Sequence, residues 1–150
     1  MRASDVMRPV AVFQADDPAE ELVRAFARPT LRAVAVVSTE GNLVGLVTDE
    51  DLLHALLPPY VRDDPVLARV LEEEAAWELC RHLEGKFVKN VVNVRGGNQT
   101  SVSPNDPLIR VISVMAQTGA PAVLVVVDDL VLGMVTVDDV LPALLSRRPS

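Results

Sequence analysis

The chain has 150 residues, of which 49% are hydrophobic and only 3% aromatic, and its formal net charge is −7. This composition predicts one globular unit with an aliphatic core, and it argues against disorder and against an aromatic base-stacking surface for single-stranded nucleic acid. The negative charge argues against broad contact with nucleic acid or an anionic membrane, so neither is expected as a partner.

The first half alternates short extended runs with amphipathic stretches. Residues 10–13 form an extended run, and Asp17-Pro18 then predicts a helix with Asp17 as its N-cap residue and Pro18 in its first position. Pro29 ends that helix. Two apolar runs, 33–37 and 43–48, predict paired strands around a polar turn, and residues 49–57 predict a second helix.

The middle of the chain, residues 58–90, predicts a helical linker. Apolar residues between Val66 and Leu79 fall on one stripe, with three consecutive glutamates on the other side, and Gly85 ends the predicted helix.

The second half repeats the order of the first. An extended run at 99–102 is followed by a helix that starts at Asn105-Asp106-Pro107 and ends at Gly119. Strands are predicted at 122–127 and 131–136, and a last helix at 137–145.

A seven-residue motif occurs in both halves. Gly-Leu-Val-Thr-Asp-Glu-Asp at 45–51 returns as Gly-Met-Val-Thr-Val-Asp-Asp at 133–139. Because an internal repeat fixes the architecture, we predict an α+β fold of two β-α-β-β-α repeats that pack as a pseudo-two-fold pair. The predicted boundaries are 1–57 for the first repeat, 58–90 for the linker and 91–150 for the second repeat.

The paired motifs resemble the tandem cystathionine-β-synthase (CBS) domain pair, also called the Bateman module. The resemblance covers nearly the whole chain except the linker. Besides the repeated motif, the matching segments are 5–12 at the entry, Asp17-Pro18, the strand at 33–37, and 101–107.

This resemblance implies a regulatory module that binds an adenosine-type ligand between its repeats. AMP, ADP, ATP or S-adenosylmethionine would be a regulatory ligand, and no cofactor would be required. The family implies a homodimer, and we expect a stand-alone module that signals to a separate, unidentified effector protein. The alternative is an interaction or scaffold protein of the same fold that binds no ligand.

The resemblance also assigns roles to the motif residues. Thr48 and Thr136 would contact phosphate, and Asp51 and Asp139 would accept hydrogen bonds from the ribose hydroxyls. Free backbone N–H groups at a helix N-terminus suit an anion, and a carboxylate suits a vicinal diol. The same residues also match an ordinary helix N-cap, so capping remains an alternative role.

The remaining predicted site residues would form the cleft around the adenine. They are Val10, Ala33 and Val34 in the first half, Thr100, Ala122 and Val123 in the second, and the motif glycines Gly45 and Gly133. For both glycines, the alternative is close backbone approach on a packed strand.

The sequence departs from the family pattern beside the threonines. Family members that bind phosphate often carry a basic residue there, whereas this chain has Asp49-Glu50 and Val137-Asp138. Arg32 stands where the family often has a phosphate-binding arginine, and the second repeat has no equivalent cation. We therefore expect at most one well-occupied site per chain.

Neither an enzyme nor a metal protein is expected. Cys80 and His82 are spaced poorly for one zinc site, His54 lies elsewhere, and no nucleophile with a base or phosphate-binding glycine loop is present. The lone cysteine, together with the lack of an apolar leader or membrane-length run, predicts a cytoplasmic location.

Overall fold

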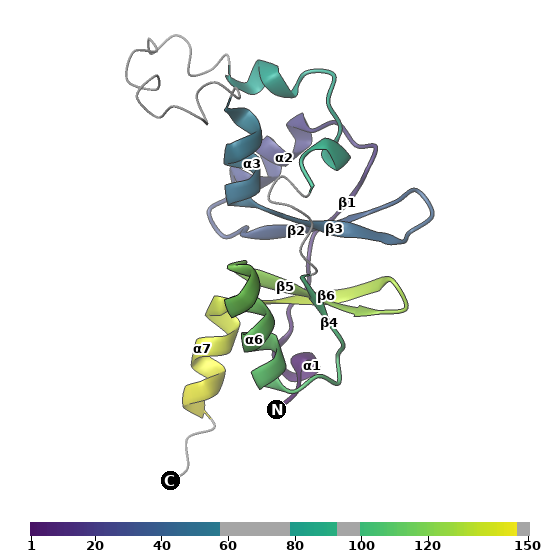
Figure 1. Cartoon of the computed structure of the whole chain (residues 1–150). Coiled ribbons are helices and arrows are strands. Elements are labelled where there is room, and N and C mark those ends of the chain that lie inside the picture. Colours follow the sequence, from purple (N-terminus) through teal and green to yellow (C-terminus); the bar gives the residue numbers. More distant parts are fainter. Residues whose placement is uncertain (58–78, 93–99, 147–150) are drawn as a thin grey trace.

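Two three-stranded sheets face each other at the centre of the molecule (Figure 1). The computed structural model describes residues 1–57, 79–92 and 100–146. The strand order is β1-β2-β3 in the first sheet and β4-β5-β6 in the second. Helices cover the outer face of each sheet, so the predicted α+β architecture of two similar repeats is confirmed.

The first repeat follows the predicted order of elements. Strand β1 (Val12–Gln14) runs parallel to β2 (Ala33–Val37), and β2 pairs antiparallel with β3 (Leu43–Thr48). Helix α2 (Glu20–Phe26) connects β1 to β2, and α3 (Asp49–Leu56) begins where β3 ends. The strand predictions at 33–37 and 43–48 match both structural strands at every boundary.

The second repeat has the same connectivity. Strand β4 (Ser101–Val102) is parallel to β5 (Ala122–Val127), which pairs antiparallel with β6 (Leu130–Thr136). Helix α6 (Leu108–Thr118) ends at Gly119, whose φ of 68° is the left-handed conformation that glycine adopts without strain. Helix α7 (Val137–Ser146) follows β6 directly.

Each repeat packs against a segment that lies outside it in the sequence. The first helix, α1 (Ala3–Val6), packs on the second repeat, where Ala3 is fully buried among α6 and α7 residues. The short 3₁₀ helices η2 (Leu79–Leu83) and η3 (Val88–Asn90) pack instead on the first repeat, where Leu83 and Val88 are buried. The spatial units therefore do not follow the order of the chain.

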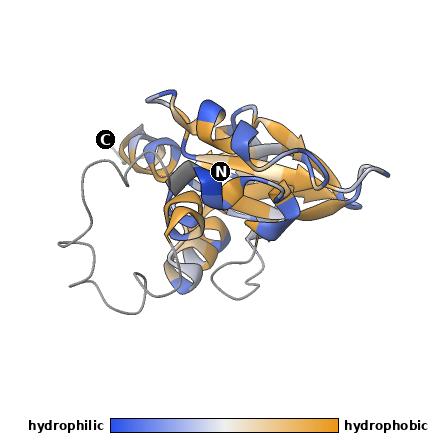
Figure 2. Ribbon diagram, turned by 90° about the horizontal axis from the view of Figure 1, so that it is seen from above, coloured by the Kyte–Doolittle hydropathy of each residue, from blue (hydrophilic) through white to orange (hydrophobic). Residues whose placement is uncertain are grey.

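Three hydrophobic clusters hold the layers together. Each sheet forms one cluster with its helices, and the third lies between the sheets (Figure 2 shows the apolar strands). The members of this inter-sheet cluster that are buried come from β2, β3, β5 and β6: Ala33, Ala35, Leu46, Ala122, Leu124 and Met134. Three of the six are alanines, and such small side chains let two sheets approach closely.

The predicted N-cap role of Asp17 is wrong. Its carboxylate instead accepts a hydrogen bond from the Gln14 N–H at 2.8 Å, and α2 begins three residues later at Glu20, behind Ala19. Asp106 makes the equivalent contact with the Ser103 N–H at 2.9 Å. Aspartate competes well for such local backbone bonds, so both Asp-Pro pairs stabilise the turn that precedes the helix.

Most of the predicted linker helix lies outside the described residues. This holds for the stripe from Val66 and for the glutamates at 72–74, whereas residues 79–83 form a 3₁₀ helix. Within the described residues, no helix is long and apolar enough to cross a membrane.

Candidate functional site

Both motif threonines lie at a junction where a strand passes directly into a helix. Thr48 pairs with Ala33 across β3 and β2, and Thr136 pairs with Ala122 across β6 and β5. The next residue in each repeat bonds the residue before the paired strand: Asp49 N–H donates to the Arg32 carbonyl at 3.2 Å, and Val137 N–H to that of Pro121 at 3.1 Å. The repeated sequence therefore produces repeated geometry.

In the first repeat, the motif residues form a capping box. The Asp51 N–H donates to Thr48 Oγ1 at 3.1 Å, and the Thr48 N–H donates to Asp51 Oδ2 at 2.9 Å. Both side chains are buried. The capping role is thus present in the structure, and it stabilises the first turn of α3.

In the second repeat, the motif aspartate binds a cation from the start of the chain. Asp139 Oδ2 accepts from the N–H and the hydroxyl of Thr136, both at 2.9 Å. The guanidinium of Arg8 binds the same carboxylate through two nitrogens, with Nε 2.9 Å from Oδ2 and Nη2 2.5 Å from Oδ1. Such a two-pronged arginine–carboxylate pair is the stronger kind of charged hydrogen bond.

Arg8 contacts a motif residue but was not among the predicted site residues. It is separated from Asp139 by 131 positions, and the fold joins them through a backbone bridge between Arg8 and Met134. The only available signal was the basic residue within the Asp5–Pro9 entry segment. The second motif thus has a cation beside it, although the position equivalent to Arg32 is Pro121 and carries no charge, as predicted.

The pair shifts the ionisation of both partners. Burial alone would raise the pKa of the Asp139 carboxyl, but hydrogen bonds from Arg8 and Thr136 and the positive charge of Arg8 outweigh it and lower the pKa below its usual 3.8. The hydrogen bond to Asp139 raises the pKa of Arg8. Both groups are therefore held in their charged forms.

This shift predicts a pH-dependent stability. A carboxylate that is more acidic in the folded chain stabilises the fold fully above its unfolded pKa, and loses that contribution as the pH falls through its folded pKa. We expect Asp139→Asn to lower the melting temperature by about 2–4 °C at pH 7, since a partly exposed pair contributes roughly 1 kcal/mol. The difference from the wild-type chain should shrink below pH 3.8.

Thermal melts from pH 7 to pH 2 test this expectation. Glu40→Gln is the matched control, because Glu40 is an exposed acid in the turn between β2 and β3. A melting difference between Asp139→Asn and wild type that stays constant over the whole range would contradict the proposed linkage.

The residues predicted to surround an adenine separate into two layers. Ala33 and Ala122 are fully buried between the sheets, with Val10 packed against the same cluster. Val34 and Val123 point to the opposite faces of their strands and are fully buried in the two helix-covered clusters. The side chains of these two valines therefore lie outside the inter-repeat layer.

The other predicted residues hold backbone positions in the sheets. The Thr100 carbonyl accepts from the Leu124 N–H at 2.7 Å, and Gly45 pairs with Val36 in the β2–β3 ladder. Gly133 lies beside the entry segment, where an added Cβ would be 2.7 Å from the Arg8 carbonyl oxygen. The alternative role of close backbone approach is therefore confirmed for Gly133.

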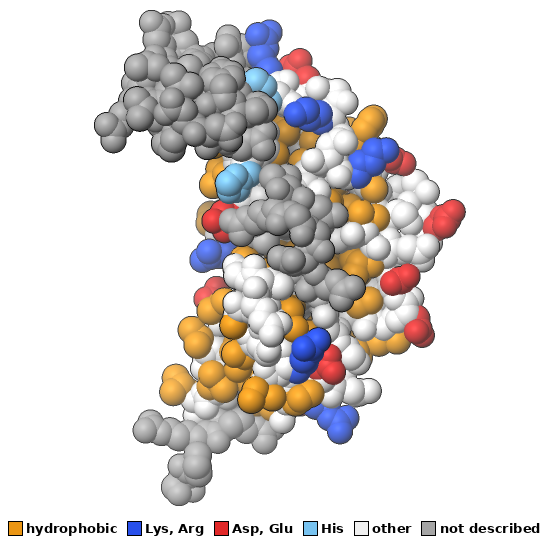
Figure 3. Space-filling view, viewed as in Figure 1, with side chains coloured by type: hydrophobic (Ala, Val, Ile, Leu, Met, Phe, Trp, Pro, Cys, Tyr) orange, Lys and Arg blue, Asp and Glu red, His pale blue; other side chains and the backbone are white. Residues whose placement is uncertain are grey.

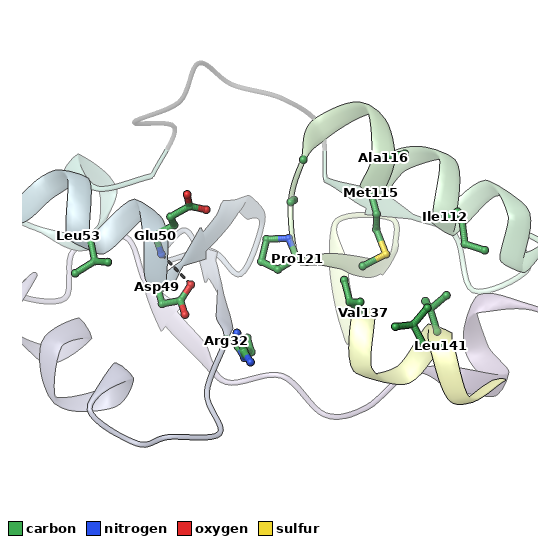
Figure 4. A pocket seen from close by; sticks show the side chains of 13 residues that line it. Arg32, Asp49, Glu50, Leu53, Ile112, Met115, Ala116, Pro121, Val137 and Leu141 are labelled. Atoms are coloured by element: carbon green, nitrogen blue, oxygen red, sulfur yellow. Dashed lines mark hydrogen bonds between the residues drawn. The ribbon is translucent and has the colours of Figure 1, made fainter. Parts of the chain in front are cut away.

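A groove of about 660 Å³ opens between the two repeats on their helical side (Figure 4). Its lining comes from the two strand–helix junctions and from α3, α6 and α7: Arg32, Asp49, Glu50, Leu53, Ile112, Met115, Ala116, Gly119, Ala120, Pro121, Val137, Val140 and Leu141. Its size falls in the usual range of small-molecule sites.

Arg32 is the one predicted site residue that lines this groove. The motif threonines and aspartates are not in its lining, but Asp49 and Val137, the residues that directly follow the two threonines, are. Among the contacts of the described residues, none pairs the Arg32 side chain with a carboxylate. Arg32 is therefore available to an anionic group of a ligand.

The protein is a tandem-repeat module. Its two α+β repeats face each other through their sheets, and a groove lies at their paired strand–helix junctions. The sequence model for the CBS domain matches residues 3–58 and 88–146, so this chain belongs to the CBS domain family.

Solved structures share this fold along nearly the whole chain. A CBS domain-containing protein of unknown function from Kribbella flavida is 27% identical, with a TM-score of 0.77 over 97% of this chain and 99% of the other. A second one, from Bacillus anthracis, is 18% identical, with a TM-score of 0.73 over 99% and 95%. CBSX2, solved in complex with AMP, is 18% identical, with a TM-score of 0.68 over 97% and 96%. No curated protein matches the chain.

Proposed function

We propose that this protein is a regulatory module that binds an adenosine-type ligand between its two repeats and passes the signal to a partner protein. The groove carries this proposal, because it joins an apolar wall to one arginine without a carboxylate partner among the described contacts. Ligand sites in proteins combine a mostly apolar lining with a few placed polar groups. The AMP complex of CBSX2, a protein of the same fold, supports the choice of ligand class.

Calorimetric titration of the full chain with AMP, ATP and S-adenosylmethionine tests the proposal. We expect heat from at least one of them, and a several-fold weaker association for Arg32→Gln, since a charged hydrogen bond contributes about 1.5–3 kcal/mol when desolvated and less when exposed. Arg28→Gln, at an exposed position after α2, is the matched control and should bind like wild type. The absence of heat from all three at millimolar concentration would refute ligand binding.

A second candidate function is an interaction or scaffold protein whose motifs serve only the fold. The contacts of Asp139 favour it, because this acid is bound by Arg8 and Thr136 and would have to release Arg8 to meet a ribose. The two candidates differ in ligand-induced thermal stabilisation, which only a binder shows.

We further propose that the protein forms a homodimer through the helical face of the second repeat. Hydrophobic side chains gather over α6 and α7 in Figure 3, and four of them are well exposed: Ile109, Leu141, Leu144 and Leu145. Contiguous exposed apolar patches mark interaction sites. Sedimentation velocity should show a dimer for wild type and a monomer for Leu145→Glu; a wild-type monomer at all concentrations would exclude the dimer.

A further inference from the structure

One segment at the start of the chain contacts both repeats. Residues 1–8, here called the strap, begin with α1, which packs against α7 of the second repeat (Figure 1). Arg8 then pairs with Met134 on β6 through two backbone hydrogen bonds, of 2.8 and 2.9 Å. Three residues later, the Ala11 carbonyl accepts the Ala35 N–H at 2.9 Å and the chain continues as β1. The strap therefore lies on the second repeat and leads directly into the first.

The backbone of the strap is held in a way that occurs a second time in the molecule. The segment 86–92 packs on the first repeat, where the Val88 N–H donates to the Asp17 carbonyl at 2.8 Å. In the second repeat the Ala3 N–H donates to the Asp106 carbonyl at 2.9 Å, at the equivalent Asp-Pro turn. Both repeats thus receive an incoming segment through the same backbone bonds, so these bonds of the strap belong to the fold.

The side chain of Arg8 adds a contact that these backbone bonds do not require. Its Nε and Nη2 lie 3.0 and 2.5 Å from Oδ1 of Asp139, and Nε also lies 2.9 Å from Oδ2. Thr136 donates its N–H and its hydroxyl to Oδ2, both at 2.9 Å. A carboxylate offers about four acceptor positions, so these contacts occupy all of them. While Arg8 is bound, Asp139 has no acceptor position left for a hydroxyl group of a ligand.

The exposure of the two side chains places Arg8 on the outside of this pair. The Arg8 side chain is 45% exposed, whereas that of Asp139 is 12% exposed. The guanidinium can therefore move into solvent by rotation of its own side chain, while the backbone of the strap stays bonded to β6. Because a partly exposed ion pair adds little free energy, this opening is energetically accessible.

We infer that the strap is a latch on the second motif, which a ligand opens by displacing Arg8 from Asp139. The inference rests on the proposed function and specifies how the second motif is regulated. In the closed state the guanidinium occupies the acid. In the open state the same carboxylate accepts the two hydroxyls of a vicinal diol, as in ribose. Since only chains with an open latch bind, the apparent affinity falls by the fraction that is open.

Adenosine is the probe that isolates this effect, because it has the diol but no phosphate that Arg8 could itself bind. An NMR titration of the isotope-labelled full chain, followed at the amides of Thr136 and Asp139, reports on the second motif. These amides separate it from the groove, whose lining includes neither residue. Arg8→Ala should bind adenosine about fivefold more tightly than wild type, the factor expected for the loss of a partly exposed ion pair.

Two controls separate the latch from a general effect on the fold. Arg2→Ala removes the other arginine of the strap, whose side chain bonds Asn105 at 3.4 Å, and this variant should bind adenosine like wild type. The second control is a ligand, 2′,3′-dideoxyadenosine, which lacks both hydroxyls and should bind Arg8→Ala and wild type equally. Arg8→Lys keeps the charge without the two-pronged contact, so its adenosine affinity should lie between those of wild type and Arg8→Ala.

The outcomes separate the latch from the proposed function. Adenosine binding to Arg8→Ala that is no tighter than to wild type, or that leaves both amides unshifted, would overturn the latch and leave ligand binding in the groove standing. An equal gain for 2′,3′-dideoxyadenosine would also overturn it, because the effect would not depend on the hydroxyls. If neither adenosine nor AMP shifts any resonance of either protein, the latch and ligand binding are refuted together.

Discussion

Leu124→Ala is expected to lower the free energy of unfolding by about 2–5 kcal/mol, the range for removing a large aliphatic side chain from a packed core. Leu124 is 1% exposed and lies on β5, the central strand of the second sheet. Its neighbours in the inter-sheet cluster include Ala33, Ala35 and Ala122, which are too small to fill the space that the substitution leaves. Because the sheets cannot close over it, the cavity persists and the cost stays high.

Equilibrium unfolding in urea measures this effect, since the midpoint and slope together give the free energy. Leu130→Ala is the control, because Leu130 lies in the same hairpin but is 62% exposed. Its loss should be within about 0.5 kcal/mol, as for ordinary surface substitutions. Equal losses for the two variants would contradict a packed layer between the sheets.

The strands could be predicted because both repeats contain the same unambiguous pattern of apolar runs. The runs at 33–37 and 43–48 are β-branched and apolar, they are bounded by polar turns, and both faces of β2 are buried. Gly119 likewise marks the end of α6, since few other residues adopt its backbone conformation without strain. Local sequence was therefore sufficient to predict these strands and this helix end, because both depend on the residues within them.

The helix starts were harder to predict, because aspartate can stabilise a turn or a cap. Asp17 and Thr48 each precede a helix, and each has an oxygen that can accept a backbone N–H. Asp17 bonds Gln14 behind it, whereas Thr48 bonds Asp51 ahead of it. Two long-range features set where α2 begins: the parallel pairing of β1 with β2, and the backbone contacts of residues 86–88 with Asp17 and Ala19. Neither feature can be predicted from local sequence.

In the candidate site, too, the residue set by local sequence could be predicted and the residue set by long-range contacts could not. Arg32 could be predicted because it immediately precedes a strand that the sequence marks clearly, and it does line the groove. Arg8 could not be predicted, because its contact with Asp139 depends on α1 packing against the second repeat. Helix α1 packs on the second repeat and the η2–η3 segment packs on the first. This arrangement is a property of the whole fold, so no local sequence pattern predicts it.

Gly133→Ala is expected to lower the free energy of unfolding by about 1–3 kcal/mol, because the added methyl group overpacks a contact between two backbones. Its Cβ would be 2.7 Å from the Arg8 carbonyl oxygen, and this oxygen accepts the Met134 N–H at 2.9 Å. Relief of the clash must move the entry segment away from β6. That movement breaks the bridge between Arg8 and Met134 and withdraws the guanidinium from Asp139, so the repeat loses its bound entry segment.

Arg8→Ala separates the backbone contribution from the side-chain contribution. It removes the guanidinium but keeps the carbonyl that bonds Met134, so we expect it to cost about 1 kcal/mol, less than Gly133→Ala. If Gly133→Ala also disrupts the ion pair, the double variant should lose less than the sum of the two single losses, as expected for residues that share one contact. Urea unfolding of the three variants gives this cycle. Strict additivity would show that Gly133 and the Arg8 side chain act independently, and a neutral Gly133→Ala would show that the entry segment does not need the close approach that this glycine permits.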